Sequence, residues 1–365
     1  MSKNYLSVVN ALTDCSPDAT GEIIIPDDVV IIDKNAFYGC DLIESVVIPD
    51  SVEEIHAKAF YMCSNLKSIK FGNGLKRIDA LAFDCDSLES IVIPASVEYI
   101  CDLAFCSSES LGSIEVDSKN KLYDSRDNCN AIIETSSNTL ILGCASSSIP
   151  EGVTVIGRDA FSGCSDLTEV VIPESVTRIG NGAFGGCSSL ESIVVDSNNK
   201  VYDSRDNCNA IIETSSNTLI LGCASSSIPE GVTVIGHDAF SGCSDLVGIW
   251  IPDSVTSIGD WAFSSCDYLD EIRIPKSVAT IGNWAFNDCS SLAEVVISNG
   301  VAKIGERAFK DCTSLTSIVI PDSVTEIGED AFKECESLKK VSIPERFKER
   351  EAEIFGEHTA EITYY

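Results

Sequence analysis

The sequence has few basic residues for its length. Lysine and arginine total 25 against 57 aspartate and glutamate residues, so the formal net charge of the 365-residue chain is −32 at pH 7. A charge of this sign repels phosphate backbones and anionic lipid head groups, which argues against nucleic acid and membrane surfaces as partners. The simpler interpretation, that the acidic excess serves solubility, stays open beside any functional one.

Long apolar runs are also missing. No stretch approaches the roughly 18 residues that a membrane-spanning helix needs, although 44% of the residues are hydrophobic. The first residues, MSKNYLSVVNALTDC, show neither the basic nor the apolar region of a secretory signal. The sequence therefore predicts a folded chain without membrane insertion, and it leaves a cytoplasmic location open.

The residues that could carry catalysis or bind a metal show no diagnostic pattern. The sequence gives the three histidines, His56, His237 and His358, no reason to meet a nucleophile and a carboxylate. No C-x-x-C pair supplies the spacing of a structural zinc site. The glycines of residues 72–74 lack the Lys and Ser/Thr of a phosphate-binding loop. We therefore predict no enzyme, no catalytic residue, no cofactor and no metal.

What the sequence does have is a repeat, usually of 23 residues. A full unit reads P-x-S-V-x-x-I-G-x-x-A-F-x-x-C-x-x-L-x-x-I-x-I, as in residues 252–274. Its Ala-Phe dipeptides end at Phe37, Phe60, Phe83, Phe105, Phe161, Phe184, Phe240, Phe263, Phe286, Phe309 and Phe332. A unit this short cannot bury its apolar faces alone, so successive copies must stack and share one core.

Each unit predicts one strand and one tight turn. The segment L-x-x-I-x-I-P indicates a short strand with alternating faces that proline ends, and stacked copies should pair in parallel about 4.8 Å apart. The glycine after V-x-x-I indicates a turn with positive φ. Asp33 and Asp79 suit such a turn, whereas His56 and Cys101, at the same position, suit it less well.

Most of the seventeen cysteines recur at one position of the repeat. A residue that recurs there behaves as a small buried hydrophobe, and a regular column offers each thiol two equal neighbours in place of one chosen partner. We therefore predict buried free thiols. The column contains Cys40, Cys63, Cys85, Cys164, Cys187, Cys243, Cys266, Cys289, Cys312 and Cys335.

Two inserts of 33 residues, at about 117–149 and 196–228, interrupt the repeat. In each, two apolar runs flank a Ser-Ser-Asn turn, which predicts a β-hairpin that projects from or caps a coil. Residues 121–167 and 200–246 differ at only two positions, which indicates a tandem duplication. With the turn at Ser136 and Ser137, Cys129 faces Cys144, and Cys208 likewise faces Cys223. Free thiols are favoured there, with a cross-strand disulfide left open.

The inserts also contain aspartates that raise the question of calcium. Their spacing does not match an EF-hand loop and the turn glycine is missing, so we interpret them as polar flanks of the hairpin. They are Asp117, Asp124 and Asp127 in one copy, and Asp196, Asp203 and Asp206 in the other.

Both ends of the chain depart from the repeat, as a solenoid requires if its core is not to be exposed. Residues 1–20 predict a degenerate first coil with apolar residues Tyr5, Leu6, Val8, Val9 and Leu12. Residues 344–365 predict a C-terminal cap. Its segment 346–357 is charged and helix-prone, with Phe347, Ile354 and Phe355 as a buried stripe, and Phe355 keeps the 23-residue phase.

The repeated motif I-G-x-x-A-F-x-x-C-x-x-L-x-x-I-x-I-P resembles the BspA-like, or Treponema pallidum type, leucine-rich repeats over nearly all of residues 21–343. The resemblance implies a right-handed, β-rich horseshoe solenoid with parallel strands, here with two hairpin inserts and terminal caps. It also implies a cell-surface or secreted protein of the kind found in gut and oral Bacteroidetes, which binds host proteins or other microbes and carries no catalytic residues.

The exposed position between the two isoleucines of I-x-I forms a predicted surface column. It contains Val47, Lys70, Val92, Glu115, Val171, Val194, Trp250, Arg273, Val296, Val319 and Ser342. Most are plain valine, whereas tryptophan and arginine are enriched at binding hot spots. We therefore predict Trp250 and Arg273 as ligand-binding residues, together with Trp261, Trp284 and Tyr268. Trp261 and Trp284 occupy one position in successive repeats, so they should stack. The alternative is that Trp261 and Trp284 merely cover the convex edge of the solenoid, and that Trp250 is local packing.

Three functions are compatible with the sequence. The first is a monomeric, adhesin-like module that binds a host or bacterial surface protein, or a glycan, through the solenoid surface. The second is an intracellular structural or scaffolding repeat protein, which the unpaired thiols favour. The third is a carbohydrate-active enzyme, for which an open solenoid rarely supplies the cleft that a pair of catalytic carboxylates needs.

Overall fold

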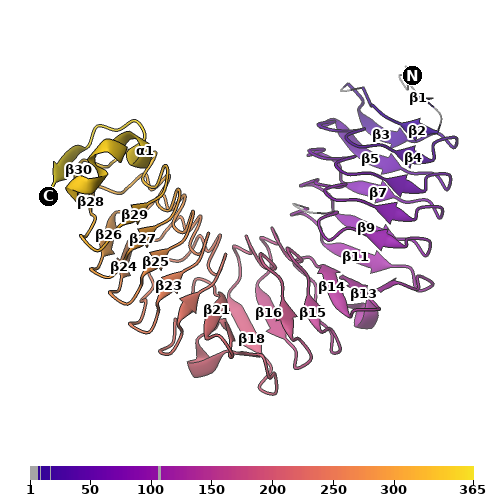
Figure 1. The fold of residues 1–365 in the computed structure, drawn as a ribbon. Coiled ribbons are helices and arrows are strands. Elements are labelled where there is room, and N and C mark those ends of the chain that lie inside the picture. Colours follow the sequence, from indigo (N-terminus) through magenta and orange to yellow (C-terminus); the bar gives the residue numbers. More distant parts are fainter. Residues whose placement is uncertain (1–6, 9, 17, 106–107) are drawn as a thin grey trace. The chain divides into compact units, whose positions relative to one another are not determined.

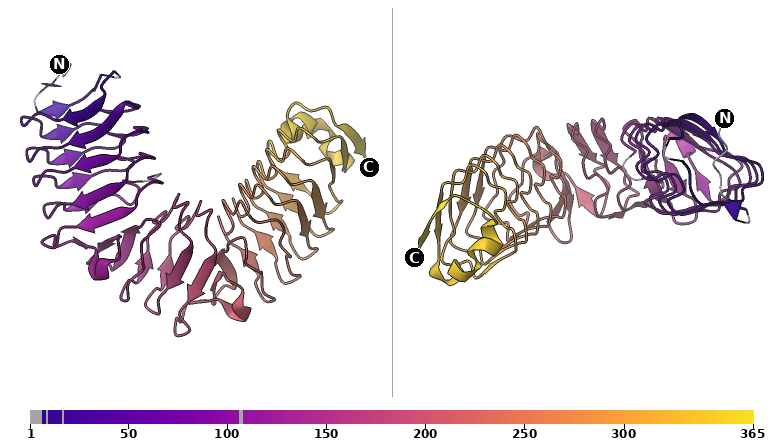
Figure 2. Two further views of the ribbon diagram at one scale, coloured as in Figure 1. Left: turned by 180° about the vertical axis from the view of Figure 1, so that it is seen from behind. Right: turned by 90° about the horizontal axis from the view of Figure 1, so that it is seen from above.

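The computed structural model of the chain describes residues 7–8, 10–16, 18–105 and 108–365. These residues form a solenoid of parallel strands, as the repeat predicts. They divide into two compact units, Met1–Leu167 with Ser175–Phe184, and Thr168–Glu174 with Gly185–Tyr365. Figures 1 and 2 show the stacked coils within each unit.

A regular coil contains a long strand from the L-x-x-I-x-I segment and a short strand from the V-x-x-I segment. In one coil these are β24 (Glu271–Ile274) and β25 (Thr280–Ile281). Alternate side chains of β24 are exposed and buried, and Pro275 follows the strand and cannot donate to a sheet. The predicted strand is therefore confirmed, and its alternation gives each coil one solvent-facing row.

The first unit begins with two parallel sheets. The long strands pair in the order β11–β9–β7–β5–β3 and the short strands in the order β2–β4–β6–β8–β10, with β1 antiparallel to β2. The long strands are β3 (Gly21–Ile24), β5 (Ile43–Val47), β7 (Ser68–Lys70), β9 (Ser90–Ile93) and β11 (Ser113–Val116). The short ones are β1 (Ser7–Val8), β2 (Ala11–Leu12), β4 (Ile31–Ile32), β6 (Glu54–Ile55), β8 (Arg77–Ile78) and β10 (Tyr99–Ile100).

The first insert is incorporated into the stack. It comprises β12 (Tyr123–Asp124), a short 3-10 helix (Arg126–Asn128), β13 (Ile132–Glu134) and β14 (Thr139–Leu142). The turn between β13 and β14 contains Ser136 and Ser137, as predicted. β14 then pairs in parallel with β15 (Val155–Ile156), which pairs with β17 (Arg178–Ile179). The hairpin thus supplies a short strand of the solenoid, whereas the sequence predicted that it projects from or caps a coil.

One asparagine side chain ends the long-strand sheet at this insert. The Asn130 side chain accepts a hydrogen bond from the N–H of Ile114 at 2.6 Å and donates one to the carbonyl of Gly112 at 2.9 Å. A side-chain amide has the same donor and acceptor as a peptide group, so it takes the place of the next strand. Asn209 bonds Ile193 and Glu191 in the same way in the second insert.

The second unit repeats this plan. Its short strands form one sheet with the second insert, in the order β19–β20–β21–β22–β23–β25–β27–β29. Its long strands pair as β16–β18, β24–β26 and β28–β30, with β31 (Glu361–Tyr364) beside β30. The long strands are β16 (Glu169–Ile172), β18 (Ser192–Val195), β26 (Glu294–Ile297), β28 (Ser317–Val319) and β30 (Lys340–Ile343). The others are β19 (Tyr202–Asp203), β20 (Ile211–Glu213), β21 (Thr218–Leu221), β22 (Val234–Ile235), β23 (Ser257–Ile258), β27 (Lys303–Ile304) and β29 (Glu326–Ile327), with a 3-10 helix at Arg205–Asn207.

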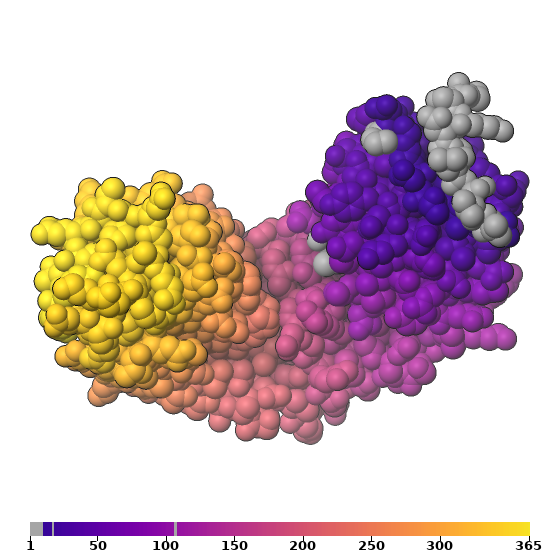
Figure 3. All heavy atoms as spheres, turned by 45° about the horizontal axis from the view of Figure 1, so that its top comes forward, coloured from indigo at the N-terminus to yellow at the C-terminus, as the bar shows by residue number. Residues whose placement is uncertain are grey.

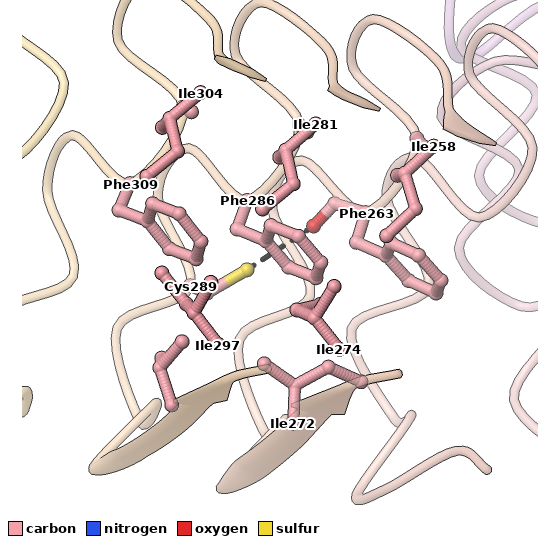
Figure 4. Packing of buried hydrophobic residues seen from close by; sticks show 14 of the residues in the cluster. Ile258, Phe263, Ile272, Ile274, Ile281, Phe286, Cys289, Ile297, Ile304 and Phe309 are labelled. Atoms are coloured by element: carbon pink, nitrogen blue, oxygen red, sulfur yellow. Dashed lines mark hydrogen bonds between the residues drawn. The ribbon is translucent and has the colours of Figure 1, made fainter. Parts of the chain in front are cut away.

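A column of phenylalanines forms the centre of the core. The ring centroids of Phe263 and Phe286 lie 5.1 Å apart, as do those of Phe286 and Phe309, and both pairs are nearly parallel, at 4°. Figure 4 shows this column between the isoleucines of the short strands and those of the long strands. Residues one repeat apart therefore occupy one file, as the 23-residue period predicts, and the two strand faces lie on opposite sides of the core.

The cysteine column is buried beside the phenylalanines. All cysteines in the described part of the chain are free thiols, and those of the column are buried, which confirms the prediction. Cys129 and Cys144 are also free: the hairpin register shifts between Ile132 and Ile133, and the Cys144 sulfur accepts a hydrogen bond from the Asn130 side chain at 3.1 Å.

The predicted positive φ at the repeat glycine is wrong. Gly259 and Gly282 do not adopt it, whereas Trp261 and Trp284, two residues further on, have φ of 59° and 57°. The glycine serves close approach instead, because a Cβ on Gly282 would lie 2.4 Å from the carbonyl carbon of Gly259 in the preceding coil. The left-handed residues are held by hydrogen bonds to the next coil, such as that from the N–H of Trp284 to Glu306, at 2.8 Å.

The C-terminal segment covers the last coil of the second unit, and Figure 3 shows its atoms, in yellow, gathered at this end. A 3-10 helix (Glu345–Arg350) and α1 (Glu351–Phe355) fall in the segment predicted to be helical. Phe355 stacks on Phe332 at 5.5 Å, in phase with the repeat. Sequence reasoning missed β31 (Glu361–Tyr364), which pairs in parallel with β30.

At the N-terminus, Leu12 is buried and β2 joins the short-strand sheet, in line with a degenerate first coil. The predicted apolar residues Tyr5, Leu6 and Val9 lie outside the described residues.

Candidate binding surface

The predicted surface column lies along the outer side of the long strands. In the first unit, Val47 is the register partner of Lys70, and Val92 that of Glu115. In the second unit, Val171 pairs with Val194, Arg273 with Val296 and Val319 with Ser342. The valines on most of these strands are exposed and equivalent, so a specific contact has to come from the residues that break the pattern.

Trp250 and Arg273 are such residues, and the structure brings them together. Trp250 has 69% of its surface exposed. It lines, together with Arg273, a hollow of about 390 Å³ on the long-strand side of the second unit. Gly248, Glu271 and Glu294 line the same hollow. Sequence reasoning missed these three, although the repeat places each of them two residues before the column.

The residues around the hollow form two short rows. Glu271 is the register partner of Glu294, and Arg273 that of Val296, on β24 and β26. One repeat earlier in sequence, Gly248 corresponds to Glu271 and Trp250 to Arg273. One row is thus glycine followed by two glutamates, and the other is tryptophan, arginine and valine. An ideal added Cβ on Gly248 meets no atom within 4 Å, so the space above its backbone is open.

The residues that follow the two duplicated segments differ at the hollow. The first copy continues after Leu167 with Glu169 and Val171, in strand β16, which pairs with β18. The second copy continues after Leu246 with Gly248 and Trp250, and residues 247–251 form no strand. Within the described residues, no N–H of 247–251 bonds another backbone group. A side chain present in the first copy is therefore absent, and backbone polar groups are left free beside the tryptophan.

The other two tryptophans form a separate stack. Trp261 and Trp284 follow the short strands β23 and β25, and their ring centroids lie 4.7 Å apart at an angle of 4°. The guanidinium of Arg307 lies 4.7 Å from the Trp284 centroid. Neither tryptophan lines the hollow, and the core separates their side of the coil from the long strands. The stacking is as predicted, but it distributes the five proposed residues over more than one surface.

Tyr268 stands apart from both groups. Its side chain is 60% exposed, and its N–H bonds the carbonyl of Ser244 in the preceding coil at 3.1 Å. It follows Cys266 and precedes β24 in the same coil, and it does not line the hollow.

Each histidine has a carboxylate neighbour, which sequence reasoning did not identify. His56 lies between Asp33, at 3.1 Å, and Glu54, at 2.9 Å, while Asp238 accompanies His237 and Glu351 accompanies His358. Burial disfavours the charged His56 ring, but the hydrogen bonds to Glu54 and Asp33 outweigh it and raise its pKa. The 23-residue repeat places Asp33 beside His56. Because the chain is rich in Asp and Glu, a carboxylate next to a histidine is a common outcome. Both ring nitrogens of His56 contact carboxylates, so the protonated ring forms ion pairs with Asp33 and Glu54.

Several aspartates of the inserts have partners close to them in sequence. Asp124 pairs with Arg126 at 2.8 Å, and Asp203 pairs with Arg205 at 2.9 Å in the twin. Asp117 accepts a hydrogen bond from the N–H of Lys119. Among the described residues, no group of three or more His, Cys, Asp or Glu is arranged to hold a metal ion.

A second cavity, of about 860 Å³, lies at the C-terminal end of the second unit. Phe332, Leu338 and Phe355 provide its apolar part, and Lys333 and His358 belong to its polar part. His358 Nδ1 is buried and has no hydrogen-bond partner among the described residues. This cavity is formed by the packing of the cap on the last coil, and sequence reasoning did not identify it.

Stacked coils of parallel strands, each with one exposed long-strand position, define a leucine-rich-repeat protein. The chain belongs to the BspA type leucine-rich repeat family, whose repeat region matches residues 14–131, 141–218, 220–339 and 302–364, in six copies. No match to the chain is found among curated proteins. No catalytic family is indicated, and in the described part of the chain no helix could span a membrane.

Several solved structures resemble this chain. A leucine rich cell surface protein from Faecalibacterium prausnitzii is 26% identical, with a TM-score of 0.52, over 94% of this chain and 87% of that one. The Treponema pallidum leucine-rich repeat protein is 27% identical, with a TM-score of 0.36, over 67% and 99%. The pneumococcal vaccine antigen PcpA is 21% identical, with a TM-score of 0.48, over 91% and 74%.

Proposed function

We propose that this protein is a non-catalytic, adhesin-like binding module that holds a host or bacterial surface partner through the long-strand side of its second unit. One observation carries the proposal: a largely exposed tryptophan, Trp250, and an arginine, Arg273, line a hollow in a column that is otherwise mostly valine. Exposed tryptophan and arginine side chains contribute most per residue to binding energy. The partner is a protein or a glycan, and the module acts as a monomer.

The proposed location is the cell surface. The Faecalibacterium prausnitzii protein, which is similar over most of both chains, is a cell surface protein. An acidic solenoid with a net charge of −32 stays soluble and repels anionic membranes, which suits a module that reaches away from the surface that carries it.

Binding to two immobilised extracts, one of host extracellular matrix and one of bacterial cell surfaces, tests the proposal. A variant with Trp250→Val and Arg273→Val carries the residue most common in the column, so its fold should be retained. We expect this variant to bind at least about tenfold more weakly than the unmodified protein. Val92→Ala, at the same column position in the first unit, is the matched control. Equal binding by all three proteins would reject the long-strand side as the contact surface.

The free thiols favour a second function, an intracellular scaffold, because a reducing compartment keeps cysteines unpaired. Fractionation of cells that produce the protein separates the two functions. Recovery from the intact cell surface by external protease supports the adhesin-like module, whereas full protection supports the scaffold.

A further inference from the structure

We infer that the hollow over Gly248 is a sugar-binding site that takes a pyranose ring stacked on Trp250. The inference rests on the proposed function, because it names the ligand chemistry of the same surface. It follows from the size of the hollow, from the groups that line it and from the twin segment that lacks it.

The size of the hollow suits a small ligand. Its volume of about 390 Å³ lies within the range of about 300–1,000 Å³ that is usual for small-molecule sites. Each of the two rows that line it spans three coils, and the rows lie two residues apart along the strand. This corresponds to a footprint of about 10 Å by 7 Å. This is large enough for one or two sugar rings and shallow enough to leave the rest of a glycan in solvent.

The indole of Trp250 offers a flat apolar surface. It is 69% exposed and belongs to no aromatic pair among the described residues, in contrast to the stacked Trp261 and Trp284. The open space above Gly248 lies beside it. A pyranose ring has one face of C–H groups that can lie against such a surface, whereas a fully polar or linear ligand gains little from it.

The polar groups around the hollow include both donors and acceptors. The carboxylates of Glu271 and Glu294 only accept hydrogen bonds, and the guanidinium of Arg273 only donates them. None of the three forms an ion pair or side-chain hydrogen bond with a described residue. The backbone groups of residues 248–250, which line the hollow and form no hydrogen bond with another described backbone group, add both kinds. Sugar hydroxyls donate and accept at once, so they can pair with all of these groups.

This mixture distinguishes a sugar from other ligands. A cation would meet the two glutamates but also Arg273, and an anion would meet Arg273 but also both glutamates. An uncharged polyol avoids both conflicts. An extended peptide could pair with the free backbone groups, but it would have to enter where Asp270 already donates to the carbonyl of Val247 at 3.1 Å.

The twin segment supplies a matched control. The double substitution Gly248→Glu and Trp250→Val gives residues 248 and 250 the side chains of Glu169 and Val171, which lie in a regular strand of the same unit. This variant should fold, and its new glutamate should fill the hollow. Loss of sugar binding by this variant is therefore attributable to the hollow itself.

The test uses fluorescence and nuclear magnetic resonance on the full chain. In a Trp261→Phe, Trp284→Phe background, Trp250 is the single tryptophan, so its emission reports the hollow alone. A panel of methyl pyranosides (gluco, galacto, manno and N-acetylglucosamine) is titrated at millimolar concentration, and saturation transfer from protein to sugar protons is recorded. We expect at least one pyranoside to shift the Trp250 emission and to show saturation of its ring C–H protons. Binding should weaken at least about tenfold in the twin-like variant and in Arg273→Ala.

Two outcomes overturn the inference. One is the absence of saturation transfer and of any emission change for every pyranoside. The other is sugar binding that the twin-like variant retains. Periodate oxidation of the extracts used above separates this inference from the proposed function. Binding that depends on Trp250 and survives periodate but not protease would identify a polypeptide partner, which rejects the sugar and keeps the binding module. Sugar contact at Trp250, together with unchanged extract binding by the Trp250→Val, Arg273→Val variant, would keep the sugar site and reject the binding module.

Discussion

The thiol of Cys289 donates a hydrogen bond to the backbone carbonyl of Phe263, one coil earlier, with 3.1 Å between sulfur and oxygen (Figure 4). The same bond recurs from Cys312 to Phe286 and from Cys335 to Phe309, at 3.2 Å in each case. The cysteine column therefore satisfies a buried carbonyl in successive coils, in addition to filling space.

This bond changes what a serine should do at position 289. Without a partner, a buried hydroxyl there would cost about 1–3 kcal/mol. With the Phe263 carbonyl as acceptor, we expect Cys289→Ser to lower the free energy of unfolding by only about 1 kcal/mol. Cys289→Ala loses the donor and leaves a small cavity, so it should cost about 2 kcal/mol. Urea denaturation measures both, and a serine variant less stable than the alanine variant would contradict the role of the hydrogen bond.

The ion pair around His56 predicts a pH dependence. Its pKa is raised from the ordinary value of 6.5, so protonated His56 stabilises the folded state. This contribution is fully present below pH 6.5 and disappears as the pH rises through the folded-state pKa. Proton NMR titration of the histidine ring should therefore give a pKa above 6.5, with His56→Gln identifying the signal. A value at or below 6.5 would mean that burial outweighs Glu54 and Asp33.

The tryptophans should differ in their effect on stability. Trp284 is stacked between Trp261 and Arg307, so Trp284→Ala should lower the free energy of unfolding by about 1–2 kcal/mol. Trp250 is largely exposed and unstacked, so Trp250→Ala should change it by less than about 0.5 kcal/mol. Denaturation curves of the two variants are compared directly. Equal losses would indicate that Trp250 is a packing residue.

Two glycines provide a test of coil spacing. A Cβ at position 282 would lie 2.4 Å from the backbone of Gly259, so Gly282→Ala must force two coils apart and should cost more than about 2 kcal/mol. A Cβ at position 248 meets no atom within 4 Å. Gly248→Ala should therefore be neutral within about 0.5 kcal/mol. Thermal unfolding of both variants checks the difference, and a neutral Gly282→Ala would refute the close approach.

Much of the fold could be predicted because the repeat constrains it. The same position in each copy must be buried or exposed in every coil, so the phase of Phe263 also places Phe286 and Phe309. The role of the repeat glycine could not be predicted from one copy. The sequence indicates that a side chain is disfavoured at this position. Either a positive φ or a close approach of two backbones would explain that, and only the distance to the preceding coil distinguishes the two explanations.

The candidate site was predicted in part. Trp250 and Arg273 stand out in their column, and the structure brings them to one hollow. Gly248 was missed because a single glycine in a segment predicted as a strand carries no functional signal. The difference is recognised only when Gly248 is compared with the corresponding residue of the first copy, Glu169. Trp261 and Trp284 were correctly expected to stack, but their position across the core from the long strands depends on how one coil folds.

The sequence by itself determined the solenoid, the register of its parallel strands and the columns of phenylalanine and cysteine, because identical units that cannot fold alone can bury their apolar faces only by stacking in phase. The tertiary structure decided where the backbones come within contact distance, which hairpin strands enter the stack, and that Gly248, Glu271 and Glu294 meet Trp250 and Arg273 around one hollow. These outcomes depend on distances between coils, and a one-dimensional period does not contain those distances.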